Sequence, residues 1–135
     1  MQTLIDNINT KFLDSAAYND VGGRVFYRKA TNPDYPRIVY SIITANPDNV
    51  FQRKGESVLM QFDIFGADSA GDAAVNTIYA DLRTLLDDWQ ITIAGYGTIQ
   101  FTWQNTVTIS EDIILDDGSS GVVHIAVDYE ITYQA

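Results

Sequence analysis

Cysteine is missing from this sequence, and that absence removes several kinds of chemistry at once. Without a thiol the chain has no disulfides, no thiolate metal ligands and no cysteine nucleophile. Histidine is nearly missing too, since His124 is the single one. A Ser-His-Asp arrangement would depend on that imidazole, and no Gly-x-Ser-x-Gly motif supplies a nucleophile. We expect His124 to be a surface residue of a strand, or one that touches a neighbouring subunit.

Long apolar runs are also missing. No stretch approaches the roughly 20 apolar residues that a membrane-spanning helix requires. The start of the chain lacks the basic and apolar regions of a secretory signal, so we expect no membrane association and residence in a cytoplasm. With 135 residues, of which 46% are hydrophobic, the composition predicts one domain covering residues 1–135.

Basic residues are scarce in the second part of the chain. Residues 55–135 contain thirteen acidic side chains and one basic one, Arg83, whereas residues 1–54 contain seven basic and five acidic ones. A protein with this excess of acidic residues is not expected to bind nucleic acid stably, because such binding depends on basic side chains that neutralise phosphates. Six of the eight basic residues fall between positions 24 and 54: Arg24, Arg28, Lys29, Arg37, Arg53 and Lys54. They are either ordinary solvated charges of strand ends and loops, or part of an interface.

Motifs for cofactors are absent as well. Neither a Gly-x-x-x-x-Gly-Lys-Ser/Thr loop nor a Gly-x-Gly-x-x-Gly motif occurs, so the sequence predicts no nucleotide cofactor. Asp112, Asp116 and Asp117 lack the spacing of an EF-hand and indicate a solvated turn. The pair Asp87 and Asp88 is typical of a solvated helix end. We therefore expect no cofactor, no metal and no enzymatic activity.

Hydrophobic periodicity is the strongest positive signal. Alternating apolar residues predict strands, and apolar residues at steps of three and four predict helices. The predicted elements are an opening helix over 2–14 that ends near 16–19, strands over 24–29, 37–45 and 57–65, a helix from Ser69 to about Trp89, and strands over 90–94, 98–109 and 123–133. Their order, α-β-β-β-α-β-β-β, predicts an α+β fold with two helices on one face of a mostly antiparallel sheet.

Individual positions within this plan can be assigned. Val75, Ile78, Leu82, Leu85 and Trp89 form one stripe that should pack on the sheet. The strand over 37–45 is expected to be central, and Trp103 to anchor the inner face of its strand. Residues 46–55 are expected to form a hairpin tip or an extended loop, and residues 110–121 a loop whose apolar residues 113–115 extend or cover the sheet.

Residues 22–88 form an ordered block of three strand patterns and one amphipathic helix, and this order resembles a known family. The matching segments are Gly-Gly-Arg-Val-Phe-Tyr at 22–27, Pro-Arg-Ile-Val-Tyr at 36–40, Phe-Asp-Ile-Phe at 62–65, Ala-Asp-Leu-Arg-Thr-Leu-Leu at 80–86 and the closing Asp-Tyr-Glu-Ile-Thr-Tyr at 128–133. Together they resemble the tail-completion or tail-terminator proteins of long-tailed bacteriophages. Residues 90–121 depart most from that pattern.

The resemblance implies a structural protein of the virion that forms a homo-oligomeric ring, typically a hexamer. Such a ring would cap the tail tube, stop its polymerisation and offer a joining surface to the head connector or stopper protein. The basic residues listed above would contact neighbouring subunits or the tube, and Asp116 and Asp117 would line a channel through which DNA passes without sticking. Two alternatives remain, a head-side connector or stopper of the same particle and a small ligand-binding α+β domain.

Overall fold

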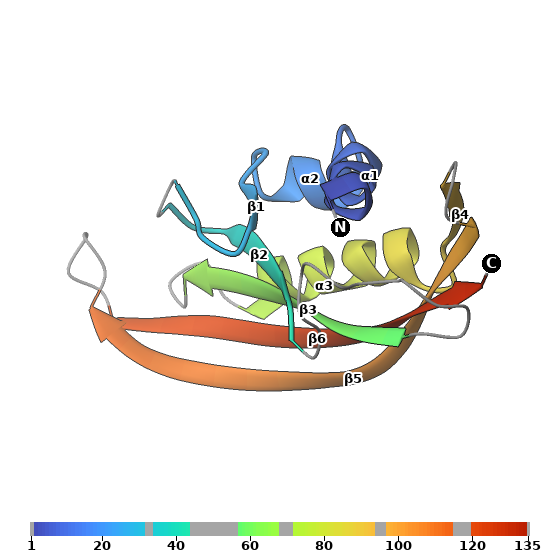
Figure 1. Ribbon diagram of the computed structural model, residues 1–135. Coiled ribbons are helices and arrows are strands. Elements are labelled where there is room, and N and C mark those ends of the chain that lie inside the picture. The colour runs from blue at the N-terminus through green and yellow to red at the C-terminus, as the bar shows by residue number, and fades with distance from the viewer. Residues whose placement is uncertain are drawn as a thin grey trace.

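A curved six-stranded sheet carries three helices on its concave face (Figure 1). The computed structural model describes residues 2–31, 34–43, 57–67, 72–93, 97–114 and 120–134. The elements in chain order are α1 (Gln2–Phe12), α2 (Ala16–Asp20), β1 (Val25–Tyr27), β2 (Arg37–Ile42), β3 (Ser57–Ala67), α3 (Asp72–Leu86), β4 (Gln90–Ile93), β5 (Gly97–Ile114) and β6 (Ser120–Gln134). This arrangement confirms the predicted α+β class.

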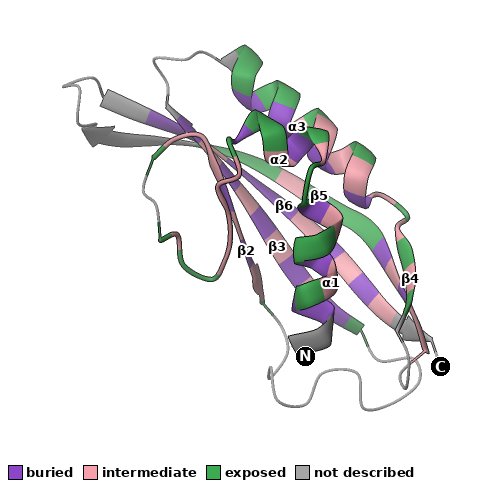
Figure 2. Ribbon diagram, turned by 90° about the horizontal axis from the view of Figure 1, so that it is seen from above, coloured by how far each residue is buried: buried purple, intermediate pink, exposed green. Residues whose placement is uncertain are grey.

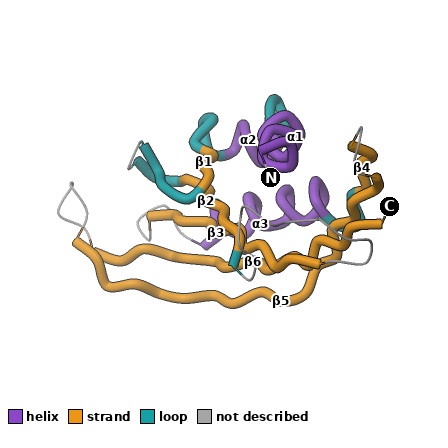
Figure 3. Tube along the Cα trace, in the orientation of Figure 1, coloured by secondary structure: helices purple, strands orange, loops and turns teal. Residues whose placement is uncertain are grey.

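The strands lie in the order β1-β2-β3-β6-β5-β4 (Figure 3). Every neighbouring pair is antiparallel except β1 and β2, which run parallel with Val25 opposite Ile38. The sheet is therefore mixed, although mostly antiparallel as predicted. The prediction that the strand starting at Arg37 is central was wrong, because β3 and β6 occupy the middle. Both of these strands are long and apolar on one face, so the centre of the sheet buries them best.

The helix count differs from the prediction. The opening helix stops at Phe12, and a separate short helix, α2, follows it. Asp14 adopts a left-handed conformation with φ of 61°, which interrupts the helical path. Ser15 then caps α2, because its Oγ accepts a hydrogen bond from the backbone N–H of Tyr18 at 3.2 Å. The break turns Leu13 into solvent, where it is 57% exposed, instead of onto the core.

The hairpin between β5 and β6 is longer than the sequence indicated. Residues 110–114 continue β5 and residues 120–121 belong to β6, so the predicted loop was wrong at these positions, whereas the expectation that residues 113–114 extend the sheet is confirmed. Residues 115–119 lie outside the described residues. Ser110 and Glu111 pair with Val123 and Val122. Pairing with an apolar strand outweighs the low strand preference of charged residues.

The core lies between the concave face of the sheet and the helices (Figure 2). The predicted inward residues of β3 and β6 are buried: Val58, Met60, Phe62, Ile64, Val123, Ile125, Val127, Tyr129 and Ile131. The predicted stripe of α3 faces them, with Val75, Ile78 and Leu82 at most 2% exposed. The period-2 and period-3.6 patterns therefore identified both sides of this core correctly.

A continuous series of aromatic contacts crosses this core. Tyr40 stacks on Phe62 with ring centroids 5.3 Å apart, and Phe62 meets Tyr129 edge-on at 5.7 Å. Phe101 then links Tyr129 to Trp89, at 6.2 Å and 4.8 Å. Such contacts add to the free energy of burial and connect β2, β3, β6 and β5 in one packed layer.

Helix α3 approaches β3 closely at Gly66. A Cβ built on Gly66 would lie 2.4 Å from Cγ2 of Val75, a distance that real Cβ atoms essentially never show. Since Val75 begins the buried stripe of α3, the missing side chain at Gly66 sets how near the helix lies to the sheet. Ser69, the predicted first residue of this helix, lies outside the described residues.

Candidate assembly interface

Four of the six basic residues singled out by sequence lie together at the β1–β2 end of the sheet: Arg24, Arg28, Lys29 and Arg37. Arg24 precedes β1, and its Nε and Nη2 donate to the carbonyl oxygens of Pro36 and Tyr35 at 2.8 and 3.3 Å. The guanidinium of Arg37 lies over the ring of Tyr35 at 4.5 Å. These two cations therefore order the segment that leads into β2.

Arg28 and Lys29 differ from them because both are exposed at the end of β1. Arg28 has φ of 67°, and its backbone N–H donates to the carbonyl oxygen of Tyr40 at 2.8 Å. This left-handed turn ends β1 after three residues and directs the chain away from the sheet. The β1–β2 end consequently presents two solvent-facing positive charges next to a short edge strand.

The other predicted interface and channel residues lie outside the part of the chain that the structure describes. Arg53 and Lys54 lie outside the described residues, as does the loop 46–55 that contains them. Asp116 and Asp117, predicted to line a channel, also lie outside the described residues. Their roles remain predictions of the sequence.

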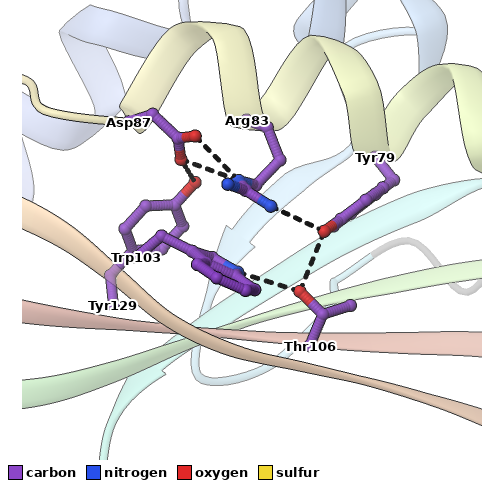
Figure 4. Close-up of polar contacts among 6 residues, drawn as sticks. All are labelled: Tyr79, Arg83, Asp87, Trp103, Thr106 and Tyr129. Atoms are coloured by element: carbon purple, nitrogen blue, oxygen red, sulfur yellow. Dashed lines mark hydrogen bonds and ion pairs between the residues drawn. The ribbon is translucent and has the colours of Figure 1, made fainter.

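A polar network that the sequence did not predict joins α3 to β5 and β6 (Figure 4). Arg83 Nε donates to both carboxylate oxygens of Asp87, at 2.8 and 2.9 Å, and Arg83 Nη1 donates to the hydroxyl oxygen of Tyr79 at 2.8 Å. Tyr129 donates its hydroxyl proton to Asp87 at 2.6 Å. Asp87 was predicted to be a solvated helix end; instead, directly after α3, it binds a cation of that helix and a tyrosine of β6.

The same network reaches the edge of the sheet through Trp103. The guanidinium carbon of Arg83 lies 4.2 Å from the centroid of the Trp103 ring. The indole N–H of Trp103 donates to Thr106 Oγ1 at 2.9 Å, and that oxygen lies 3.0 Å from the hydroxyl of Tyr79. Trp103 thus faces α3, as predicted, but it is 40% exposed and does not anchor the buried core.

Ionisation in this network follows from its contacts. Burial raises the pKa of Asp87, but the hydrogen bonds from Arg83 and Tyr129 outweigh burial, so the pKa of Asp87 lies below its usual value. The same hydrogen bond between Arg83 and Asp87 raises the pKa of Arg83. Burial, followed by the neighbouring Asp87, raises the pKa of Tyr129. The network therefore keeps one ion pair and a neutral tyrosine between α3 and the sheet across the physiological pH range.

His124 belongs to a second cluster, on the face of the sheet away from the helices. Its Nε2 lies 2.7 Å from Asp63 Oδ1, and its ring stacks on Phe65 with centroids 4.3 Å apart. His124 lies on the polar face of its strand as predicted, and Asp63 and Phe65 of the adjoining β3 leave its side chain 13% exposed. Contact with a neighbouring subunit stays a prediction. Asp128, close by on β6, has its pKa raised by burial and by the charge of Asp63.

Metal sites and membrane spans can be assessed only for residues 2–31, 34–43, 57–67, 72–93, 97–114 and 120–134, the described part of the chain. Within it, no group of three or more histidine, aspartate and glutamate side chains has an arrangement that could hold a metal ion. None of its helices combines the length and the apolar character needed to span a bilayer.

The chain is a structural protein of the bacteriophage tail type, because the family model described as "Tail completion protein gp17" matches residues 12–134. The chain belongs to this tail completion family, which confirms the resemblance found in the sequence. The family is one of structural proteins of phage tails.

Solved structures show the same fold. One chain from a structure described as "Virion of native gene transfer agent (GTA) particle" superimposes with a TM-score of 0.59 at 11% identity, covering 94% of this chain and 92% of that one. A second solved chain superimposes with a TM-score of 0.56 at 13% identity, covering 100% of this chain and 98% of that one. No curated protein sequence matches. At these identities the likeness supports the fold, and the family model supplies the class.

Proposed function

We propose that this protein is a tail terminator, which assembles as a hexameric ring on the end of the finished tail tube. The observation that carries this proposal is the match of the tail completion family over residues 12–134. One ring face would match the last tube ring, and the other would lack the surface that recruits further tube subunits. The second face would then be available to the connector or stopper protein of the head, at the neck end of the virion.

The distribution of charge supports a head-to-tail ring. In such a ring each subunit offers one surface to the next copy and a different surface to the previous copy. The segment 25–42, which spans β1 and β2, contains three basic residues and one acidic one, a net charge of +2. Residues 90–134, which span β4 to β6, contain six acidic residues and no basic one, a net charge of −6. The β1–β2 side of one sheet and the half formed by β6, β5 and β4 of the next would therefore attract each other across copies.

Two pairs of residues that lie outside the described part of the chain also belong to this proposal. Arg53 and Lys54 would contact the tube or the neighbouring subunit, and Asp116 and Asp117 would line the channel so that DNA passes without adhering. Reversing the first pair to Arg53→Glu and Lys54→Glu should impair tube capping. Unchanged capping would remove these two residues from the contact.

Depletion of the protein during phage growth tests the proposed function. We expect tails of irregular, excessive length that fail to join heads, and electron microscopy of lysates measures both properties. Tails of normal, uniform length that still join heads would refute the terminator function. Tails of normal length that fail to join heads would assign the protein to the head side of the neck instead.

A further inference from the structure

Strand β5 has a long open edge. It extends over Gly97–Ile114, but β4 pairs with it only from Gly97 to Gln100. On the side of β5 away from β6, no strand of the described part of the chain lies beside the remaining residues. The stretch from Thr102 to Ile109 is mostly exposed (Figure 2). Thr106 is its one half-buried position. An open edge of this length presents a row of backbone donors and acceptors to which another strand can pair.

The chemistry of this edge suits a protein contact. Residues 97–110 contain no charged residue and no proline, the two devices that usually protect an exposed edge from pairing. Val107 and Ile109 are 44% and 39% exposed on one side of the strand, and Trp103 is 40% exposed on the other. Exposed apolar groups along an unprotected edge are typical of an interaction site.

Trp103 is also held in place before any partner arrives. Arg83 lies against its ring at 4.2 Å, and Thr106 accepts its indole N–H. A fixed tryptophan loses little side-chain entropy on binding, and tryptophan and arginine are enriched among the residues that dominate interface energies. The network around Arg83 therefore positions an anchor at the open edge.

We propose that the open edge of β5, from Thr102 to Ile109, is the surface that receives the β1–β2 end of a second copy of this chain. The inference rests on the proposed ring and names its subunit contact. Charge selects this occupant: the uncharged edge belongs to the segment 90–134 of net charge −6, so two such segments repel each other, whereas the β1–β2 end carries a net charge of +2. Arg28 and Lys29, exposed beside the edge strand β1, meet the acidic end of the neighbouring sheet.

Because the chain contains no cysteine, engineered cysteines test the contact without background. The double variant Lys29→Cys/Asn105→Cys places one thiol at each proposed surface, at two exposed positions. We expect a short bismaleimide cross-linker to convert it into a ladder of covalent oligomers, both in concentrated solution and on tail tubes. Each single variant should give no ladder.

The outcomes separate this contact from the function of the ring. A ladder without tube capping would support the contact and refute the terminator function. Capping without a ladder in either sample would support the terminator function and refute the contact. Covalent dimers from Asn105→Cys alone, as abundant as those of the double variant, would show that β5 edges pair with each other and would overturn the proposal. Absence of a ladder in both samples would also overturn it.

A substitution at the edge gives an independent measurement. Val107→Lys adds a charge to an exposed position, so the fold should be retained, while its assembly should weaken at least about tenfold because strand edges bearing lysine resist pairing. The matched control is Leu13→Lys, at a residue 57% exposed in the turn after α1. Equal assembly of the two variants, measured by sedimentation at several concentrations, would contradict the proposed surface.

Discussion

Replacing Arg83 by methionine tests how strongly the polar network fixes α3 to the sheet. Methionine keeps the apolar stem but removes the ion pair with Asp87, the hydrogen bond to Tyr79 and the stacking on Trp103. Hydrogen bonds to charged groups contribute about 1.5–3 kcal/mol and a cation–π contact about 0.5–1 kcal/mol. Because the side chains of Arg83 and Asp87 are 27% and 32% exposed, we expect the lower part of the combined range, a loss of about 2–3 kcal/mol.

The pH dependence of this loss distinguishes the network from simple packing. The pKa of Asp87 in the folded protein lies below its ordinary value of 3.8, so its contribution is present above that pH and disappears as the pH falls through the folded pKa. Urea unfolding at about pH 7 should therefore separate the Arg83→Met variant from the wild type, and unfolding at about pH 3 should bring them closer together.

The control for this experiment is Thr84→Met, at the exposed neighbouring position of α3, which should change the unfolding free energy by less than about 0.5 kcal/mol. An Arg83→Met variant within about 0.5 kcal/mol of the wild type near pH 7 would refute the energetic role of the network. A difference that is the same near pH 3 and pH 7 would refute the role of the Asp87 charge.

Two further substitutions test other contacts of α3. Gly66→Ala should lower the unfolding free energy by about 1–3 kcal/mol, because its Cβ would overlap Val75. Adding Val75→Ala should relieve the overlap. If thermal denaturation shows Gly66→Ala to be as stable as the wild type, the close approach of α3 is contradicted. The hydrogen bond with Asp81, followed by burial and the charge of Asp81, raises the pKa of Asp20 to about 6. The contact between Asp20 and Asp81 therefore stabilises the folded protein below pH 3.8, and this contribution is lost as the pH rises through about 6. Asp20→Asn should stabilise the protein near pH 8 and give no gain near pH 4. The expected gain near pH 8 is only about 0.5–1 kcal/mol, because Asp20 is exposed. Equal gains in chemical denaturation at the two pH values would contradict the shared proton.

The central layers of the fold were predictable because their signal is local. The alternation of Phe62 and Ile64 on β3, of Val127 and Tyr129 on β6, and the stripe containing Leu82 on α3 each depend on a short repeat in the sequence. The order of these elements was enough to identify the family. Local periodicity does not specify which strands become neighbours, which is why β2 was placed at the centre in error.

The candidate site was less predictable because its contacts join distant segments. Arg83 and Trp103 lie on different elements, and Asp63 and His124 on strands that are paired only in the folded sheet. One sequence signal pointed toward the ion pair of this network: Arg83 is the single basic residue after position 54, and Asp87 follows it by one helical turn. The basic cluster at β1–β2 was found from sequence because its members are close along the chain.

The most direct test of the central claim is to add purified protein to growing tail tubes of the same phage and to image them by electron microscopy. The account predicts a ring on one end of each tube and an end to tube growth once the ring is present. Tubes that continue to lengthen at the same rate, with no ring at either end, would contradict it.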